Sequence, residues 1–213
     1  MRTIAVIARK GGSGKTTVAT HLALAAFRRG QKVMHADADL QRSSTEALRM
    51  RKGPGPQVVE TSGPKLFALK VGALRDGVGT LVIDTPAGPE TEVCHAIVLA
   101  DLSIVVVRPS YLDLLMAVRT VDILHRLGKP GLVVLNQAPF ARAGAEPPLV
   151  RKALEALQLL HTPIAPIIIR ARMAYQEALS AGLSVEELPP PTPAAEEIER
   201  LWEAVQDRLA GRL

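Results

Sequence analysis

The chain has 213 residues, of which 47% are hydrophobic and 22% charged, and it carries a formal net charge of +5 at pH 7. A chain of this length and apolar content can bury a core of its own, which excludes the small domains that depend on disulfides or structural metals. The basic balance favours a polyanionic partner, whereas aromatic residues, at only 3%, offer no stacking platform of the kind that single-strand nucleic-acid binders use.

Short apolar runs rich in β-branched residues alternate with longer helical patterns along the chain. The runs that we interpret as strands are residues 3–8, 32–36, 66–69, 80–83, 102–107, 131–135 and 164–169. This alternation predicts an α/β fold, a doubly wound and mostly parallel sheet of about seven strands with helices on both faces. Such open sheets bind ligands at the carboxyl ends of their strands, so polar motifs at those ends are expected to gather in one site.

The first predicted strand leads into a glycine-rich loop, residues 10–17, which a helical pattern follows. Glycines let the backbone turn tightly and aim its N–H groups at phosphate oxygens. Lys15 supplies positive charge, the Thr16 hydroxyl is a candidate ligand for Mg²⁺, and the helix start adds the positive end of its dipole. The chain is therefore predicted to bind ATP with Mg²⁺. The loop residues predicted to contact the nucleotide are Gly11, Gly12, Ser13, Gly14, Lys15, Thr16 and Thr17.

The loop departs from the standard pattern G-x-x-x-x-G-K-[ST] at its start. Arg9 stands where the first glycine would fall, and a second lysine, Lys10, lies just inside the loop. This arrangement resembles the deviant phosphate loop of the ParA/MinD family of ATPases. The resemblance implies that Lys10 reaches the nucleotide of a partner subunit, that two copies enclose ATP in a homodimer, and that Lys10 and Lys15 both serve hydrolysis.

An acidic segment, residues 35–43, lies at the end of the second predicted strand and looks like the D-x-D-P-Q segment of the same family. Asp37, Asp39 and Gln41 match this segment directly, whereas Leu40 replaces the usual proline. Asp39 is the predicted hydrolysis residue, because a carboxylate beside the γ-phosphate can orient the attacking water. It is also a candidate ligand of Mg²⁺ through water. An acidic turn without a catalytic role is the alternative interpretation.

Two further strands end in polar residues. The fourth predicted strand ends at Asp84, in the layout of a Walker B segment, and we expect Asp84 to bind Mg²⁺ through a water molecule. The sixth ends at Asn136. In similar proteins an asparagine at this place reads the adenine edge, so Asn136 is the predicted base contact. A side chain that only caps a turn is the alternative for Asn136.

The likeness to ParA-type proteins extends to residues 170–178, with Gly182 and Val185, and thus covers nearly the whole chain. We expect no N-terminal helix-turn-helix domain, because the first strand begins at residue 3, so the chain is most similar to short ParF-like and orphan ParA members. The resemblance implies an ATPase that binds DNA without sequence preference and segregates or positions plasmid or chromosome DNA or another large cargo. Hydrolysis would be slow and stimulated by a ParB-like or other adaptor protein.

The basic residues that we expect to contact double-stranded DNA are Arg170 and Arg172, with weaker candidates at Arg142, Arg151, Lys152 and Arg200. Such contacts would be insensitive to sequence and sensitive to salt, because they release counterions from the phosphate backbone. The nucleoid is the expected location of the protein.

The chain is expected to form one domain, residues 1–213, with a terminal helix, residues 194–210, packed on it by an apolar face. Cys94, the only cysteine, is expected to be a small buried residue. No stretch reaches the roughly 18 apolar residues of a membrane span, and the first residues lead directly into a strand rather than a signal peptide, so a cytoplasmic location is expected.

Two alternatives to a DNA-binding ATPase remain. A MinD-like positioning ATPase would attach to a membrane through the terminal helix, which would then need a more basic polar face. A metabolic enzyme of the same superfamily, such as a dethiobiotin-synthetase-like ligase, would use ATP to phosphorylate a small acid. The phosphate loop of those enzymes lacks the signature lysine that Lys10 resembles, which argues against the second alternative.

Overall fold

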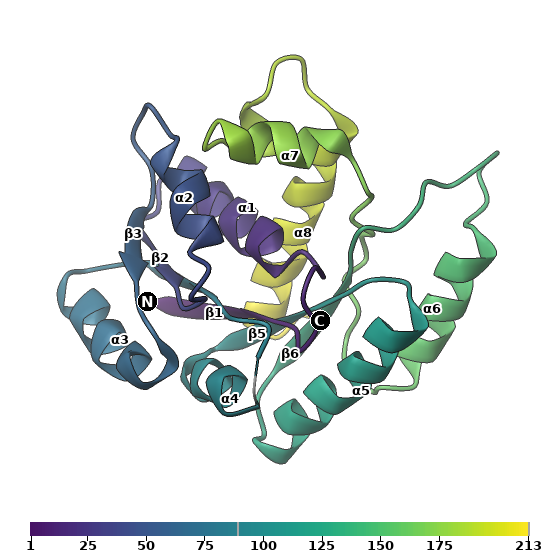
Figure 1. Ribbon diagram of the computed structural model, residues 1–213, viewed down its shortest axis with the longest axis horizontal. Helices are drawn as coiled ribbons and strands as arrows, with labels where there is room; N and C mark the ends of the chain where they lie inside the picture. Colours follow the sequence, from purple (N-terminus) through teal and green to yellow (C-terminus); the bar gives the residue numbers. More distant parts are fainter. Residues whose placement is uncertain (89, 213) are drawn as a thin grey trace.

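The computed structural model describes residues 1–88 and 90–212, and it has an α/β architecture in which helices cover both faces of a parallel sheet (Figure 1). The strand order is β3-β2-β4-β1-β5-β6, and every pairing is parallel. The strands are β1 (Arg2–Ile7), β2 (Val33–Asp37), β3 (Gln57–Glu60), β4 (Thr80–Asp84), β5 (Leu102–Val107) and β6 (Gly131–Leu135). The order reverses at β1, which places the loop after β1 at the point where open parallel sheets bind ligands.

The helices divide into two layers. The elements are α1 (Lys15–Arg28), α2 (Ser43–Arg49), α3 (Leu66–Arg75), α4 (Glu90–Leu99), α5 (Tyr111–Arg126), α6 (Pro148–Gln158), α7 (Met173–Ser180) and α8 (Pro193–Leu209), with short 3₁₀ turns η1 (Gly63–Lys65) and η2 (Val185–Glu187). Figure 1 shows α1, α2, α7 and α8 on one side of the sheet and α3 to α6 on the other.

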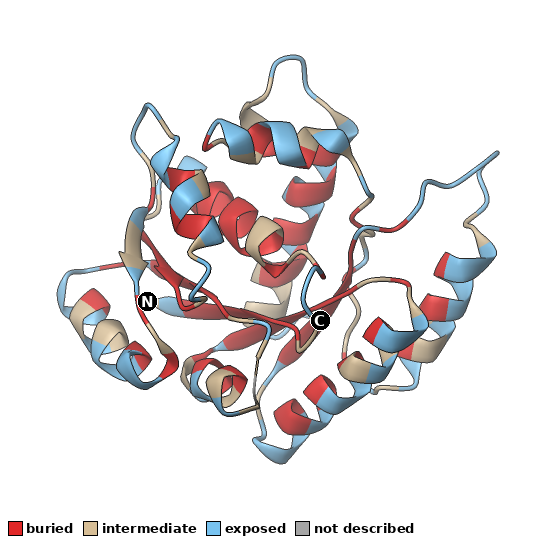
Figure 2. Ribbon diagram, viewed as in Figure 1, coloured by how far each residue is buried: buried red, intermediate tan, exposed pale blue. Residues whose placement is uncertain are grey.

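The central strands are buried on both faces, as Figure 2 shows. Along β1, Ile4 and Val6 belong to the core beneath α1 and α8, whereas Ala5 and Ile7 belong to the core beneath α3 to α6. This alternation follows from the period of two in a strand. It explains why the central strands form nearly continuous apolar runs in the sequence.

The third predicted strand is wrong. Residues 66–69 begin helix α3, and the strand that pairs with β2 is β3, residues 57–60. A run of four apolar residues is too short to show whether apolar residues repeat every two positions, as in a strand, or every 3.6 positions, as in a helix. Here Leu66 and Ala73 are the buried residues of α3, seven positions apart on one helical face, and Pro64 lies within the 3₁₀ turn that precedes the helix. The strand β3 lies at the edge of the sheet and is only half-buried, so its apolar signal is weak.

The seventh predicted strand, residues 164–169, is an extended segment beside β6 that does not form a regular strand. Its backbone pairs with β6 where Ala165 donates to Val133 (2.8 Å) and Ile169 donates to Leu135 (3.0 Å). Pro163 and Pro166 have no backbone N–H to contribute, so the ladder is interrupted. The sheet therefore has six strands among the described residues.

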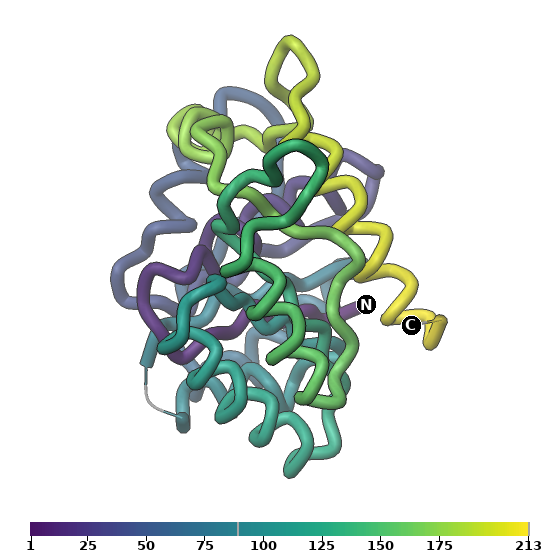
Figure 3. The backbone as a smooth tube through the Cα atoms, turned by 90° about the vertical axis from the view of Figure 1, so that its right-hand side faces the viewer, coloured from purple at the N-terminus to yellow at the C-terminus, as the bar shows by residue number. Residues whose placement is uncertain are grey.

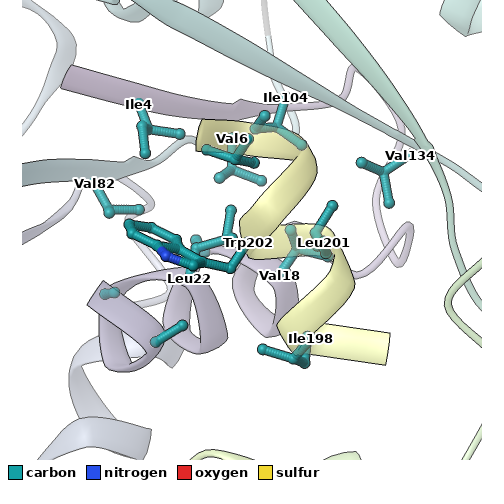
Figure 4. Packing of buried hydrophobic residues seen from close by; sticks show 14 of the residues in the cluster. Ile4, Val6, Val18, Leu22, Val82, Ile104, Val134, Ile198, Leu201 and Trp202 are labelled. Atoms are coloured by element: carbon teal, nitrogen blue, oxygen red, sulfur yellow. The ribbon is translucent and has the colours of Figure 1, made fainter. Parts of the chain in front are cut away.

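The predicted terminal helix is α8, which runs along one side of the molecule in Figure 3. Its apolar residues enter the same core as α1 and the sheet, and Figure 4 shows Trp202 next to Leu22 of α1. Cys94 of α4 is a free, half-buried thiol rather than a fully buried residue. Its neighbours His95 and Val98 line an open groove with it, which leaves the thiol partly accessible. None of the helices within the described residues is long and apolar enough to cross a membrane.

Replacement of Trp202 by alanine is expected to lower the free energy of unfolding by about 3–5 kcal/mol, because a buried aromatic side chain is lost and a cavity remains. Urea denaturation followed by far-ultraviolet circular dichroism measures this change. Leu159→Ala is the matched control, since Leu159 is 75% exposed, and it should change stability by less than about 0.5 kcal/mol. A Trp202→Ala variant as stable as the wild type would contradict the packing of α8 on α1.

Candidate active site

The glycine-rich loop connects β1 to α1 and takes a conformation that side chains resist. Gly12 has a φ of 74° and Gly14 a φ of 90°, both in the left-handed region that favours glycine. Gly14 is also crowded, because a Cβ atom on it would lie 2.1 Å from Nδ2 of Asn136. Helix α1 begins at Lys15 directly after this turn. Its first N–H groups and its dipole are therefore available to an anion in the loop.

Lys15 is buried although it is charged, with 6% of its surface exposed. Burial lowers the pKa of its ammonium group, and the carboxylates of Asp84 and Asp39 act in the opposite direction. The structure thus brings Lys15, Asp39 and Asp84 together from three different strand ends, as the sequence predicts. A partly desolvated lysine that faces carboxylates is suited to an ionised phosphate group that arrives with a divalent cation.

Asp84 is the most strongly perturbed carboxyl group of the site. It is fully buried at the end of β4, directly opposite Asp37 of β2. Burial raises its pKa to about 7; the hydroxyls of Thr16 and Ser44 and the charge of Lys15 act against the shift, whereas the charge of Asp37 adds to it. Neither carboxylate oxygen has a hydrogen bond of good geometry within the described residues. A buried, unpaired carboxylate is unfavourable by itself, and a water-bound Mg²⁺ beside Thr16 would fit this donor set.

The two other aspartates differ in role. Asp37 is fully buried and accepts hydrogen bonds from the backbone N–H (3.0 Å) and the hydroxyl (2.8 Å) of Thr45, so it anchors the start of α2. Asp39 is half-buried, and its carboxylate accepts a hydrogen bond from the N–H of Gln41 (2.9 Å). This local bond is the strand-end turn that the sequence offered as an alternative. The turn and a role beside the phosphates are compatible, because Asp39 still acts on the charge of Lys15.

Asn136 and Gln137, which follow β6, hold the glycine-rich loop by hydrogen bonds to its backbone. Its Nδ2 donates to the backbone carbonyl of Ser13 (2.8 Å), and Nε2 of Gln137 donates to the carbonyl of Gly12 (3.1 Å). Asn136 is buried, with 2% of its surface exposed. The structure therefore gives Asn136 a contact that sequence reasoning missed, and it adds Gln137 to the site. Neither contact has a local sequence signal, because β6 and the loop are more than 120 residues apart.

A pocket of about 310 Å³ opens beside Asn136 and is large enough to take the base end of a nucleotide. It is lined by Thr17, Asn136, Gln137, Arg170, Ala171, Arg172, Met173, Tyr175 and Gln176. The pocket thus joins the first turn of α1, the end of β6 and the segment before α7. Only the first two of these elements were recognisable as parts of the site in the sequence.

Arg170 and Arg172, the expected DNA contacts, are engaged within the chain. Arg170 forms a bidentate ion pair with Glu146, and its guanidinium also donates a hydrogen bond to the carbonyl of Pro139 (2.8 Å). Arg172 donates to Glu197 (2.7 Å), and its guanidinium lies 5.0 Å from the ring centre of Phe140. These contacts occupy donors that a DNA phosphate would need. Both arginines face the pocket beside Asn136, which favours a role at the nucleotide site.

Lys10 is held by its own subunit. Its Nζ lies 2.9 Å from Oδ2 of Asp113, a buried residue in the first turn of α5. Burial acts to raise the pKa of Asp113, but hydrogen bonds from Arg108, Ser110 and Lys10 outweigh it and the pKa is lowered. Asp113 is therefore a stable anion that fixes Lys10. Sequence reasoning missed this residue, although Ser110 followed three positions later by an acid is the pattern of a helix cap.

Residues 4–210 match the family model of the CobQ/CobB/MinD/ParA nucleotide binding domain. The chain belongs to this family. It is an ATPase of the ParA/MinD class. Two relatives match most of its length. The maintenance of carboxysome distribution protein A of Gloeobacter kilaueensis is 32% identical over 191 residues, which cover 86% of this chain and 83% of the relative. The protein of the same name from Halothiobacillus neapolitanus is 27% identical over 198 residues, with 87% of each chain covered.

Solved structures share the fold of this ParA/MinD-class chain. The McdA–ATP complex of Cyanothece superposes with a TM-score of 0.80 at 20% identity and covers 97% of this chain and 96% of its own. MinD of Pyrococcus horikoshii with Mg-ADP superposes with a TM-score of 0.78 at 22% identity and covers 99% and 97%. The predicted α/β fold is confirmed by these likenesses, with six strands rather than about seven.

Gly14→Ala is expected to weaken ADP binding by at least about tenfold, because a left-handed alanine is strained and its methyl group would displace Asn136 from the loop. Calorimetric titration with Mg²⁺-ADP measures the effect. Gly128→Ala is the matched control, since Gly128 also has a positive φ of 61° but open space where a Cβ would stand. Equal ADP affinity of the Gly14→Ala variant and the control would contradict the crowding between Gly14 and Asn136.

The stability of the metal-free protein should depend on the ionisation of Asp84. The folded-state pKa of about 7 lies above the value in an unfolded chain, so the folded state holds a proton that the unfolded state releases between about pH 4 and 7. The free energy of unfolding of the wild type, relative to Asp84→Asn, is therefore expected to fall with rising pH in this window, on the order of 1 kcal/mol per pH unit. Urea titrations with a chelator at several pH values measure it, and a difference independent of pH would contradict the buried, unpaired carboxylate.

Proposed function

We propose that this protein is an ATP-switched dimer that binds double-stranded DNA without sequence preference and positions a large cargo on the nucleoid. The observation that carries the proposal is that the two lysines of the loop have different partners: Lys10 is paired with Asp113, whereas the buried Lys15 is acted on by Asp39 and Asp84. Lys15, at the start of α1, serves the subunit's own phosphates in this proposal. Lys10 is instead held by Asp113 and would serve the partner's nucleotide once that contact is exchanged.

In this proposal, different residues of the site bind the phosphates, the metal ion and the base of ATP. The phosphates lie in the loop against Lys15 and the start of α1, and Thr16 holds Mg²⁺ together with Asp84 and Asp39 through water. The metal ion, when bound, neutralises charge on the phosphate oxygens. Asp39 orients the water that attacks the γ-phosphate, because its second carboxylate oxygen is not needed for the turn at Gln41. The base enters the pocket beside Asn136, which can read its edge.

Dimerisation is what makes DNA binding respond to ATP. In the proposal Lys10 leaves Asp113 and contacts the partner's phosphates, so the γ-phosphate holds two subunits together. Two weak DNA surfaces joined in this way bind far more tightly than one, through effective concentration, and hydrolysis separates them. The candidate DNA contacts are exposed basic residues of α6 and the preceding loop, Arg142, Arg151 and Lys152. The net charge of +5 favours such contacts.

The cargo is proposed from the relatives. Two relatives that this chain resembles along most of their length are named for maintaining carboxysome distribution. We therefore propose that the cargo is a large protein assembly or a DNA locus, linked by an adaptor protein that stimulates hydrolysis. A membrane-attached role has less support, because the apolar side chains of α8 are buried in the core and are not available to lipid.

The proposal is tested with an Asp39→Ala variant, which should bind ATP but not hydrolyse it. Sedimentation velocity is expected to show a dimer with Mg²⁺-ATP and a monomer with Mg²⁺-ADP. Co-sedimentation with duplex DNA should follow the dimer and weaken as salt rises. Lys10→Ala in the same background should abolish the dimer and leave ADP binding intact, because Lys10 does not contact the subunit's own loop phosphates in this proposal.

Lys65→Ala is the matched control. Lys65 is exposed and lies directly before α3, and its replacement lowers the net charge by the same amount as Lys10→Ala. It should retain the ATP dimer and DNA binding. An ATP dimer that ignores DNA would contradict the DNA-binding part of the proposal. A Lys10→Ala variant that still forms the dimer would contradict the role of Lys10.

A further inference from the structure

Glu197 of α8 is a buried carboxylate that the proposed mechanism does not use. Its side chain is 7% exposed, and it lies in the second turn of the helix among residues that face the core. In the sequence it stands between Glu196 and Glu199, both exposed, and all three look like acids that favour a helix start. Only the structure separates Glu197 from its neighbours.

Both carboxylate oxygens of Glu197 accept hydrogen bonds from one short segment, residues 170–175. Oε2 accepts from the backbone N–H of Arg170 (3.1 Å) and from the hydroxyl of Tyr175 (2.8 Å), and Oε1 accepts from Nε of Arg172 (2.7 Å). Tyr175 is itself buried, with 4% of its surface exposed. A buried carboxylate with three donors from a single segment fixes the backbone and two side chains of that segment together.

The same segment forms one wall of the 310 Å³ pocket beside Asn136. The opposite wall is Asn136 and Gln137, and the backbone joins the two walls where Ala171 donates to Ala138 (3.0 Å). Glu197 does not line this pocket; it lies behind the wall. Any effect of Glu197 on a molecule in the pocket must therefore pass through Arg170, Arg172 or Tyr175.

The phosphate end of the site is held by other contacts. Asn136 and Gln137 bind the loop carbonyls and Lys15 begins α1, and in the described part of the chain the hydrogen bonds of Glu197 go to residues 170–175 instead. Asn136 and Gln137 belong to both ends of the site, whereas Glu197 supports only the wall formed by residues 170–175. A change at Glu197 therefore acts first on that wall and leaves the hydrogen bonds of Asn136 and Gln137 to the loop in place.

We infer that Glu197 is a positioning residue for the base of the nucleotide: it holds the wall formed by Arg170, Arg172 and Tyr175 so that the pocket beside Asn136 accepts a purine base. This inference rests on the proposed nucleotide site. It makes α8 a part of the site's architecture rather than only a cover for the core. A glutamine at this position could accept on one side only, and its NH₂ group would face donors on the other.

The test compares a ligand with a base and one without. Calorimetric titration of Glu197→Gln is expected to show about tenfold weaker binding of Mg²⁺-ADP than the wild type, the size of effect that follows from loss of charged hydrogen bonds. Mg²⁺-tripolyphosphate has no base, so the variant should bind it with an affinity within about twofold of the wild type. A twofold change is smaller than the loss of one charged hydrogen bond would cause. Glu199→Gln is the matched control, because it removes an exposed charge from the same helix, and it should leave both affinities unchanged.

Tyr175→Phe provides a second variant if Glu197→Gln does not fold. It removes one of the three donors and keeps the buried ring, and about threefold weaker ADP binding with unchanged tripolyphosphate binding is expected. Unchanged ADP binding in the variants, or an equal loss for both ligands, would overturn the inference and leave the proposed function standing. Wild-type protein that binds neither ligand would instead overturn the proposed nucleotide site.

Discussion

The buried charges at the carboxyl edge of the sheet, Lys15 on one side and Asp84 and Asp37 on the other, constrain the rest of the site. Burial disfavours the charged form of both groups: it lowers the pKa of Lys15 and raises that of Asp84, and the attraction between the two charges offsets only part of this effect. Parallel strands bring this about, since β2 and β4 end at the same level and place Asp37 opposite Asp84. Within the described residues, the oxygens of Asp84 still have no hydrogen bond of good geometry. A bound cation and phosphate would complete the set, which is why the chemistry belongs at this edge.

The single subunit keeps its second lysine away from this charge cluster. Lys10 is paired with Asp113, and Asp113 is also bound by Arg108, so the anion would keep a cationic partner if Lys10 moved. In the proposed dimer, Lys10 would exchange one anionic partner, Asp113, for another, a phosphate, and no charge would be left unpaired. A contact of this type can respond to the presence of a γ-phosphate, because small differences in free energy decide between the two states.

Contacts from both β6 and α8 hold the site together. The phosphate loop is bound from β6 through Asn136 and Gln137, whereas the segment before α7 is bound from α8 through Glu197. Arg170 links that segment to the loop before α6 through Glu146. Arg170 and Arg172, which the sequence suggests as DNA contacts, therefore line the pocket beside Asn136. The exposed basic residues of α6 are left as the better candidates for DNA.

Local patterns were enough to predict the α/β class, the glycine-rich loop and the gathering of Lys15, Asp39 and Asp84 at one edge of the sheet, because glycines, charged residues and apolar strands follow rules that act over a short segment. They were wrong at residues 66–69 and only partly right at 164–169, where a short apolar run and two prolines made the local signal ambiguous. No local pattern could predict that Asp113 holds Lys10, that Asn136 and Gln137 hold the loop, or that Glu197 holds Arg170, Arg172 and Tyr175. These are contacts between buried polar groups far apart in the chain, and a partner is found for such a group by how the helices pack on the sheet.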